Sequence, residues 1–194
     1  DGEQYIVSIA NDGIRGVDGA SIDQYAGSTS ITKTPNISSD LADSATLNLS
    51  LNTSTPKKGD VIATLGSSEN ELDKLPLLVF DMKAEKDTVK VTDIEVGVVK
   101  SGSGAATAVT AYLFEGSTEP DNASITNGTA SYTDFDYVIP RDSTKTFTAK
   151  VDITGANATE ARFYARASTT AASYLVAENS RGDSITESGS ATGQ

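Results

Sequence analysis

The segment 144–153 constrains the fold of this chain most, because apolar and polar residues alternate strictly along it: Thr-Lys-Thr-Phe-Thr-Ala-Lys-Val-Asp-Ile. Successive side chains of a β-strand point to opposite faces of a sheet, so this pattern predicts one face in a core and one in water. The same alternation recurs at 45–51 and 161–167. Only residues 69–75 suggest a helix, and seven residues are too few for more than one turn. The sequence therefore predicts an all-β protein.

Short alternating or apolar runs separated by turn residues continue along the whole chain. They predict strands at 5–10, 45–51, 61–65, 77–80, 88–99, 109–114, 132–139, 144–153, 161–167 and 173–178. We expect 45–51 and 61–65 to form one hairpin, 132–139 and 144–153 another, and residues 116–122, with Pro120, to form a loop. Strands at this spacing predict a two-sheet antiparallel β-sandwich of jelly-roll or immunoglobulin-like kind in a single domain.

One predicted strand contains a change of phase. Between 88 and 99 the apolar residues move from odd positions, Val89 and Val91, to even positions such as Ile94 and Val96. A regular strand cannot do this without moving side chains across the sheet, so we expect a β-bulge near Thr92 and Asp93.

The length of 194 residues fits one sandwich domain, which we place at residues 20–180. Residues 1–19 then form an N-terminal strand followed by a glycine-containing hinge. Residues 181–194 end in Ser-Gly-Ser-Ala-Thr-Gly-Gln, which predicts a flexible low-complexity tail.

Composition excludes several classes of function. The chain has no His and no Cys, which removes the commonest proton shuttle, the thiol nucleophile and the usual zinc ligands. A net charge of −12 disfavours binding to nucleic acid and to anionic membranes, and no apolar run approaches the length of a membrane-spanning helix. We expect a protein that is not an enzyme, outside the cell or at its surface, with no nucleic-acid partner and no membrane insertion.

Calcium is the one cofactor that the residue types leave open, because it binds oxygen ligands. Candidate ligands are Asp12 and Asp18 in turns, and Asp134 and Asp136 at a strand edge. The alternative is that these carboxylates cap turns, as Asp does in many acidic loops.

Six Asn-x-Ser/Thr motifs predict candidate glycosylation sites, at Asn36, Asn48, Asn52, Asn122, Asn127 and Asn157. The motif marks an acceptor and not a modification, and several matches in a chain rich in Ser and Thr can be accidental. Asn48 and Asn52 alternatively belong to a polar strand face in contact with water.

Two further motifs have competing interpretations. Arg162 and Arg166 share one face of a predicted strand, where they either bind a ligand or form a solvated surface beside Tyr or carboxylate groups. The tripeptide Arg181-Gly182-Asp183 spells an integrin-type motif, but Gly and Asp also favour an ordinary turn.

Roughly half of the chain resembles a known type of protein. The segments 77–84, 88–98, 111–118 (Ala-Tyr-Leu-Phe-Glu-Gly-Ser-Thr) and 137–140 through 150–153 resemble β-sandwich repeats of bacterial and archaeal surface-layer proteins. They are also similar to the β-sandwich subunits of donor-strand filaments such as pili and cannulae. The resemblance implies assembly at the cell surface and brings no catalytic residues.

The resulting hypothesis is a structural subunit of an extracellular filament, tube or surface layer whose partners are copies of itself. Its N-terminal strand, with Tyr5, Ile6, Val7 and Ile9, would be donated to the open sheet edge of the next copy. That strand could instead pair within its own sandwich. The alternative function is a cell-surface adhesion or glycan-binding module, and a hydrolase built on paired carboxylates is a third class.

Overall fold

The computed structural model describes residues 6–27, 29–34, 45–61, 71–157, 159–169 and 175–194. Every regular element in these residues is a β-strand, as the alternation predicted. Within the same residues, no helix is long and apolar enough to cross a membrane. The chain divides into two compact units, residues 1–40 and 41–194.

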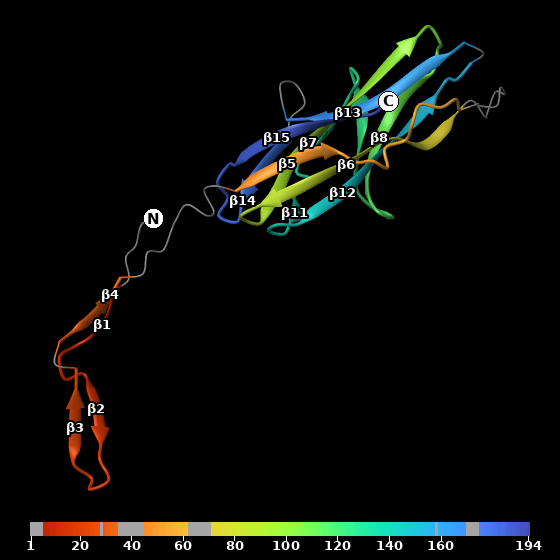
Figure 1. Cartoon of the computed structure of the whole chain (residues 1–194). Coiled ribbons are helices and arrows are strands. Elements are labelled where there is room, and N and C mark those ends of the chain that lie inside the picture. Colours follow the sequence, from red (N-terminus) through yellow and green to blue (C-terminus); the bar gives the residue numbers. More distant parts are fainter. Residues whose placement is uncertain (1–5, 28, 35–44, 62–70, 158, 170–174) are drawn as a thin grey trace. The chain divides into compact units, whose positions relative to one another are not determined.

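The first unit contains two antiparallel two-stranded ribbons, drawn in red and orange in Figure 1. Strand β1 (Val7–Ile9) pairs with β4 (Ile31–Lys33), and β2 (Ile14–Val17) pairs with β3 (Asp23–Ala26). The turn between β2 and β3 is closed by the Asp18 carboxylate, which accepts hydrogen bonds from the backbone N–H groups of Ala20 and Ile22. The predicted strand at 5–10 is thus present, but as part of a ribbon.

The second unit contains the other eleven strands, in one continuous sheet (Figure 1). They are β5 (Thr46–Leu51), β6 (Leu72–Glu85), β7 (Val89–Gly102), β8 (Thr107–Glu115), β9 (Thr118–Thr126), β10 (Thr129–Tyr132), β11 (Tyr137–Ile139), β12 (Thr144–Thr154), β13 (Ala161–Ser168), β14 (Leu175–Asn179) and β15 (Thr186–Thr192). The order of neighbours is β10-β9-β8-β12-β6-β5-β15-β13-β7, and β10 pairs with β7 as well as with β9. The sheet therefore closes on itself into a barrel of nine strands, while β11 and β14 add to the two edges of β7.

The predicted two-sheet sandwich is therefore wrong. A sandwich needs two sheets that no hydrogen bonds connect, whereas here two short strands connect what would be separate layers. Strand β10 joins β9 to β7, and β15 joins β5 to β13. The β5–β15 pair is also parallel, unlike the other pairings of the described strands. The sequence pattern predicts which residues face a core but not whether the sheet around that core is open or closed.

The core follows the predicted alternation. Along β12 the side chains of Phe147, Ala149, Val151 and Ile153 are buried, with the intervening residues more exposed. Phe147 lies at the centre of an aromatic group, 5.8 Å from Phe80, 6.0 Å from Phe135 and 4.9 Å from Tyr137 between ring centroids. Edge-to-face and offset ring contacts of this kind stabilise a core beyond the burial of area.

The bulge predicted in β7 is confirmed. Val176 of β14 pairs with Asp93 and Ala177 pairs with Val91, so Thr92 has no opposite residue in this ladder. Burial changes phase at the same place, because Val89 and Val91 are buried before it and Ile94 and Val96 after it. The Thr92 carbonyl instead accepts a hydrogen bond from the Phe135 N–H at 2.7 Å.

Three local predictions need correction. The helical turn over 69–75 is wrong in its described part, because β6 already begins at Leu72. The loop at 116–122 shrinks to a turn at Gly116 and Ser117, and Pro120 lies within β9 at a register shift where the ladder does not need its N–H. The strands β11 and β12 do not pair, since β11 joins β7 and β12 joins β6 and β8. Residues 62–65 lie outside the described residues, and the described partners of β5 are β6 and β15.

The fourth correction concerns the domain boundaries. A flexible tail was predicted at 181–194, whereas Thr186–Thr192 form β15 inside the closed sheet. Low-complexity composition misled here because this strand needs small residues: Ala191 and Gly193 are buried, and a Cβ on Gly189 would overlap the Leu49 carbonyl oxygen. At the other end, the first unit extends to residue 40 and not to residue 19.

Candidate functional site

The first unit exposes nearly all of its side chains. Every described residue from 6 to 26 and from 29 to 34 is exposed. Its large apolar side chains are between 42% and 67% exposed and are Ile6, Val7, Ile9, Ile14, Val17, Ile22, Tyr25 and Ile31. A two-stranded ribbon in water is marginally stable because it has no layer against which to bury one face. These ribbons therefore present apolar surface that their own unit does not cover.

The residues predicted to mediate assembly lie on this surface. Val7 and Ile9 belong to β1, opposite Lys33 and Ile31 of β4, and are 63% and 42% exposed. Ile6 precedes the strand and is 67% exposed. Tyr5 lies outside the described residues. In the described residues, β1 pairs with β4 of the first unit; the alternative was pairing inside its own sandwich.

The two aspartates predicted as calcium ligands in the first unit have local roles. Asp18 accepts backbone hydrogen bonds of 2.9 Å from Ala20 and 3.0 Å from Ile22, and these bonds hold the pKa of its carboxyl below the usual value. Asp12 sits in a turn with a φ of 57°, and its N–H donates to the Gly27 carbonyl oxygen. The Asp18 carboxylate thus caps its turn, as in the turn-capping alternative, whereas the bond at Asp12 is made by its backbone.

Asp134 and Asp136 lie between β10 and β11, with φ angles of 58° and 50°. Asp136 forms an ion pair of 2.8 Å with Lys90 of β7. Across the described residues, no group of three or more Asp or Glu side chains is placed to hold a metal ion. Calcium binding at the four aspartates stays a prediction.

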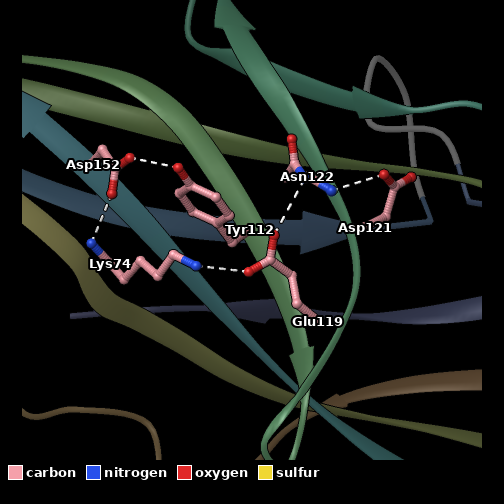
Figure 2. A network of polar contacts seen from close by, with 6 residues as sticks. All are labelled: Lys74, Tyr112, Glu119, Asp121, Asn122 and Asp152. Atoms are coloured by element: carbon pink, nitrogen blue, oxygen red, sulfur yellow. Dashed lines mark hydrogen bonds and ion pairs between the residues drawn. The ribbon is translucent and has the colours of Figure 1, made fainter.

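A polar network that the sequence did not predict covers the outer face of β6, β8, β9 and β12 (Figure 2). Asp152 accepts hydrogen bonds from the Lys74 N–H at 2.7 Å and from the Tyr112 hydroxyl at 2.6 Å. The Lys74 ammonium reaches Glu119 at 2.7 Å, and Glu119 also accepts a bond from the Asn122 side chain at 3.2 Å. The bond to Glu119 raises the pKa of Lys74, and the bond to Asp152 raises the pKa of Tyr112.

This network holds an irregular part of the sheet together. Lys74 has a φ of 50°, and the ladder between β6 and β12 shifts register between Val151 and Ile153. The ammonium group of Lys74 also lies 4.5 Å from the centre of the Tyr112 ring and 5.2 Å from the centre of the Phe114 ring. The charged groups of Lys74, Glu119 and Asp152 each have a partner, and the lysine side chain is half exposed. These contacts stabilise the packing of four strands, and their arrangement does not indicate proton transfer. No sequence signal marks it, because its members come from four separate segments.

A second cluster links β11 to β8 and β12. The Lys145 ammonium forms an ion pair of 2.7 Å with Glu115 and lies 6.0 Å from the centre of the Tyr137 ring. Hydrogen bonds from Lys145 and from the Tyr137 hydroxyl hold the pKa of Glu115 below its usual value. The contacts of Tyr137 connect β11 to β8 and β12, with which β11 does not pair through its backbone.

The predicted glycosylation sites differ in how they are presented. Asn127 and Asn157 are exposed outside the strands, in a turn and a loop, and Asn48 and Asn122 are exposed on β5 and β9. The Asn52 amide donates two hydrogen bonds to the Asp81 carboxylate, at 2.9 and 2.8 Å, so a glycan there would displace them. Asn36 lies outside the described residues. Modification at any of these sites stays a prediction.

The two arginine motifs have partners within the chain. Arg162 pairs with Glu160, and the Arg166 side chain lies over Gly97, where a Cβ would be 3.1 Å from its Nε. In the Arg181-Gly182-Asp183 turn, Arg181 Nε lies 3.2 Å from the Asp183 carboxylate. The two charged ends of that tripeptide therefore pair with each other, which is the turn interpretation.

One shallow hollow of about 210 Å³ lies on the outer surface where β7, β10 and β14 meet. It is lined by Asp93, Ile94, Glu95, Ser131, Tyr132, Thr133 and Val176. The Ser131 hydroxyl already donates to Glu95 at 3.0 Å. Asp93 and Glu95 place two carboxylates in this hollow, and none of its lining residues is a lysine or arginine. The lining therefore does not indicate a particular reaction.

Comparisons with known protein families, with curated proteins and with solved structures found no match. The functional argument therefore rests on this chain alone.

Proposed function

We propose that this chain is a structural subunit of an extracellular self-assembling filament, tube or surface layer, and that its first unit joins one copy to the next. The observation that carries the proposal is the contrast between the two units. The second has a filled apolar core inside a closed sheet, whereas the described part of the first has none and exposes eight large apolar side chains. Such surface on a soluble chain marks an interaction site.

A copy of the same chain fits as the partner. The segment 4–10, Gln-Tyr-Ile-Val-Ser-Ile-Ala, carries no charge in a chain whose net charge is −12, so it can approach another acidic copy without repulsion. Contact between this segment and a different surface of the next copy is head-to-tail, and head-to-tail contacts that do not close produce filaments. The composition, which is rich in Ser, Thr, Gly and Asn and poor in Lys and Arg, supports placement outside the cell.

A glycan-binding module is the weaker interpretation. Modules of that kind hold sugars against exposed aromatic rings. Among the aromatic residues that the structure describes, Tyr25 alone is exposed, while the Tyr112 ring lies beneath Lys74. The described residues therefore offer no aromatic platform on the closed sheet.

The test changes the apolar surface of β1 in the full-length chain. We expect the double variant Val7→Lys, Ile9→Lys to remain monomeric under conditions in which the unchanged chain forms polymers, because lysine cannot be buried at those positions without a partner. The matched control is Ser8→Lys, which adds charge to the same strand on its polar face. Light scattering over a concentration series and negative-stain electron microscopy give the readout. An unchanged chain that stays monomeric throughout would exclude the proposed function.

A further inference from the structure

The first and the last described strands of the second unit lie side by side and run in the same direction (Figure 1). Strand β5 pairs with β15 in a parallel ladder that extends from Thr46 opposite Thr186 to Ser50 opposite Ser190. The chain therefore enters β5 at the end of the pair where β15 also begins, and it leaves β15 at the other end. Entry and exit of the closed sheet lie at opposite ends of one strand pair.

Tension along the chain would act on this pair lengthwise. A force on residue 45 pulls β5 towards its own beginning, and a force on residue 194 pulls β15 towards its own end. Because the two strands are parallel, these directions are opposite. The hydrogen bonds between paired strands run across the strand direction, so all of them are loaded together and have to break together. In an antiparallel pair of terminal strands, entry and exit would lie at the same end, and the bonds would open one after another.

Both strands are also held along their other edges. Strand β5 pairs with β6 at every residue from Thr46 to Leu51. Strand β15 pairs with β13 along Ser190–Thr192, and beyond them the Gly193 N–H donates to the Ala165 carbonyl oxygen at 2.8 Å. Neither strand can therefore leave the sheet without breaking two ladders. A load on either end of the chain reaches the strands of the closed sheet through these pairs.

The packing of β5 and β15 opposes sliding between them. Leu47 and Leu49 of β5 and Ala191 of β15 are buried, and a slip of one residue would turn such side chains to the other face. Gly189 adds a steric obstacle, because a Cβ at its position would lie 1.9 Å from the Leu49 carbonyl oxygen. A slip of β15 by one or two residues brings a residue with a Cβ to this place. The pair therefore resists moving from one register to the next.

We propose that the second unit is a load-bearing module, in which the parallel β5–β15 pair resists tension applied between the two ends of the chain. This function goes beyond the proposed assembly, because it belongs to a single copy and needs no polymer. In the proposed assembly, the first unit would supply one end of the load, since it precedes β5 in the chain. The closure of the sheet by β15 then has a mechanical role as well as a structural one.

Single-molecule force spectroscopy of the full-length chain tests the direction of the load. In the axial geometry, handles hold the two ends of the chain. In the second geometry, one handle holds the C-terminal end and the other holds the single cysteine of Thr53→Cys, which is a unique attachment point because the chain has no Cys. Thr53 is exposed and follows β5, so both handles then pull at the same end of the β5–β15 pair. The pair should open there one bond at a time.

The two geometries extend nearly the same length of chain from the second unit. Residues 45–194 or 53–194 release about 50 nm in either case, since an extended residue spans about 3.5 Å. At one loading rate we expect the unfolding force to be about threefold higher, or more, in the axial geometry. Equal forces, or a lower axial force, would overturn the proposal. A chain that resists axial load but never polymerises would refute the proposed assembly and leave this inference intact.

Two matched variants separate the strand pair from general stability. Leu49→Ala in β5 and Leu113→Ala in β8 each remove a leucine that is at most 1% exposed, so both should lower the free energy of unfolding in urea. Forced unfolding depends on the contacts that break at its barrier, and β8 is separated from β5 by β12 and β6. We expect Leu49→Ala to reduce the axial force by about a third or more and Leu113→Ala to leave it nearly unchanged. An equal reduction in both would show that the whole fold resists the load and would refute the role of the pair. If either variant fails to fold, the comparison of geometries in the unchanged core decides.

Discussion

Tyr132 carries a polar atom that the closed core leaves without a hydrogen bond. Its side chain is 1% exposed, and its hydroxyl has no hydrogen-bond partner among the residues that the structure describes. Burial, together with the negative charges of Asp121 and Glu119, raises the pKa of this hydroxyl well above the usual value of 10.0. The hydroxyl therefore stays protonated. Its burial removes its hydrogen bonds to water, and no hydrogen bond within the described residues replaces them.

Removal of that hydroxyl should therefore be neutral or stabilising. We expect Tyr132→Phe to leave the free energy of unfolding unchanged or to raise it by up to about 1 kcal/mol. The matched control is Tyr112→Phe, which loses the bond of 2.6 Å to Asp152 and should lower the free energy of unfolding. Urea denaturation of the three proteins measures both changes. A loss of stability in Tyr132→Phe as large as in the control would show that the buried hydroxyl has a partner.

The ionisation of Glu115 should make the free energy of unfolding depend on pH in the acid range. Hydrogen bonds from Lys145 and Tyr137 hold the pKa of its carboxyl below the usual 4.5 in the folded protein. The folded state then binds this proton less readily than the unfolded chain, so the stabilisation is complete above about pH 4.5 and is lost as the pH falls through the folded-state pKa.

Replacing this carboxylate should flatten the acid side of the stability profile. We expect Glu115→Gln to be less stable than the unchanged chain at pH 7, by no more than about 1 kcal/mol because the pair is partly exposed to water. The difference should shrink as the pH falls from about 4.5 through the folded-state pKa of Glu115. Denaturant unfolding across this pH range checks it, with Glu71→Gln at an exposed position as the control. A difference in stability that is the same at every pH would contradict the lowered pKa of Glu115 in the folded protein.

At the scale of elements, β15 decides the architecture although its sequence resembles a linker. It connects β5 to β13 and thereby closes the sheet. Its Gly189 has a φ of 96°, a conformation that L side chains rarely adopt, and the Leu49 carbonyl leaves no space for a Cβ. A strand in this position must use small residues, so it cannot show the alternation of large apolar side chains that identifies β12.

A single methyl group should therefore disrupt the closure. We expect Gly189→Ala to lower the free energy of unfolding by about 2 to 4 kcal/mol, since strain and overlap add together. The control is Gly116→Ala, which also has a positive φ, of 60°, but has open space around it and should cost about 1 kcal/mol. Thermal and denaturant unfolding compare the two. Equal costs would mean that the contact with Leu49 relaxes without effect on the sheet.

At the scale of the whole molecule, the two units differ in how much of their own stability comes from a buried core. The closed sheet buries side chains such as Phe80, Phe147 and Leu47 completely, whereas the ribbons of the first unit depend on their turns and on the Arg15–Asp23 ion pair of 2.8 Å at the surface. An exposed ion pair contributes about 1 kcal/mol or less. The first unit therefore has most to gain from contact with another copy, which is the physical basis of the proposed assembly.

The sequence alone determined the strand class and the facing of residues. The period of two in β12, the phase change at Thr92 and the apolar run in β6 each depend on side chains a few residues apart, so local pattern was sufficient. One hairpin signal was present but not used: Asn127-Gly128 forms the two-residue turn between β9 and β10, with φ angles of 52° and 80°. Its recognition would have predicted the hairpin of β9 and β10.

Tertiary structure alone decided how the strands are connected in space and which polar groups meet. Closure depends on β10 and β15, each of which pairs with strands far away in the sequence. The Lys74 network joins residues up to 78 positions apart. Pairing partners depend on the packing of the entire sheet. A single strand's residues therefore record which side of it faces the core, but not which strand lies beside it.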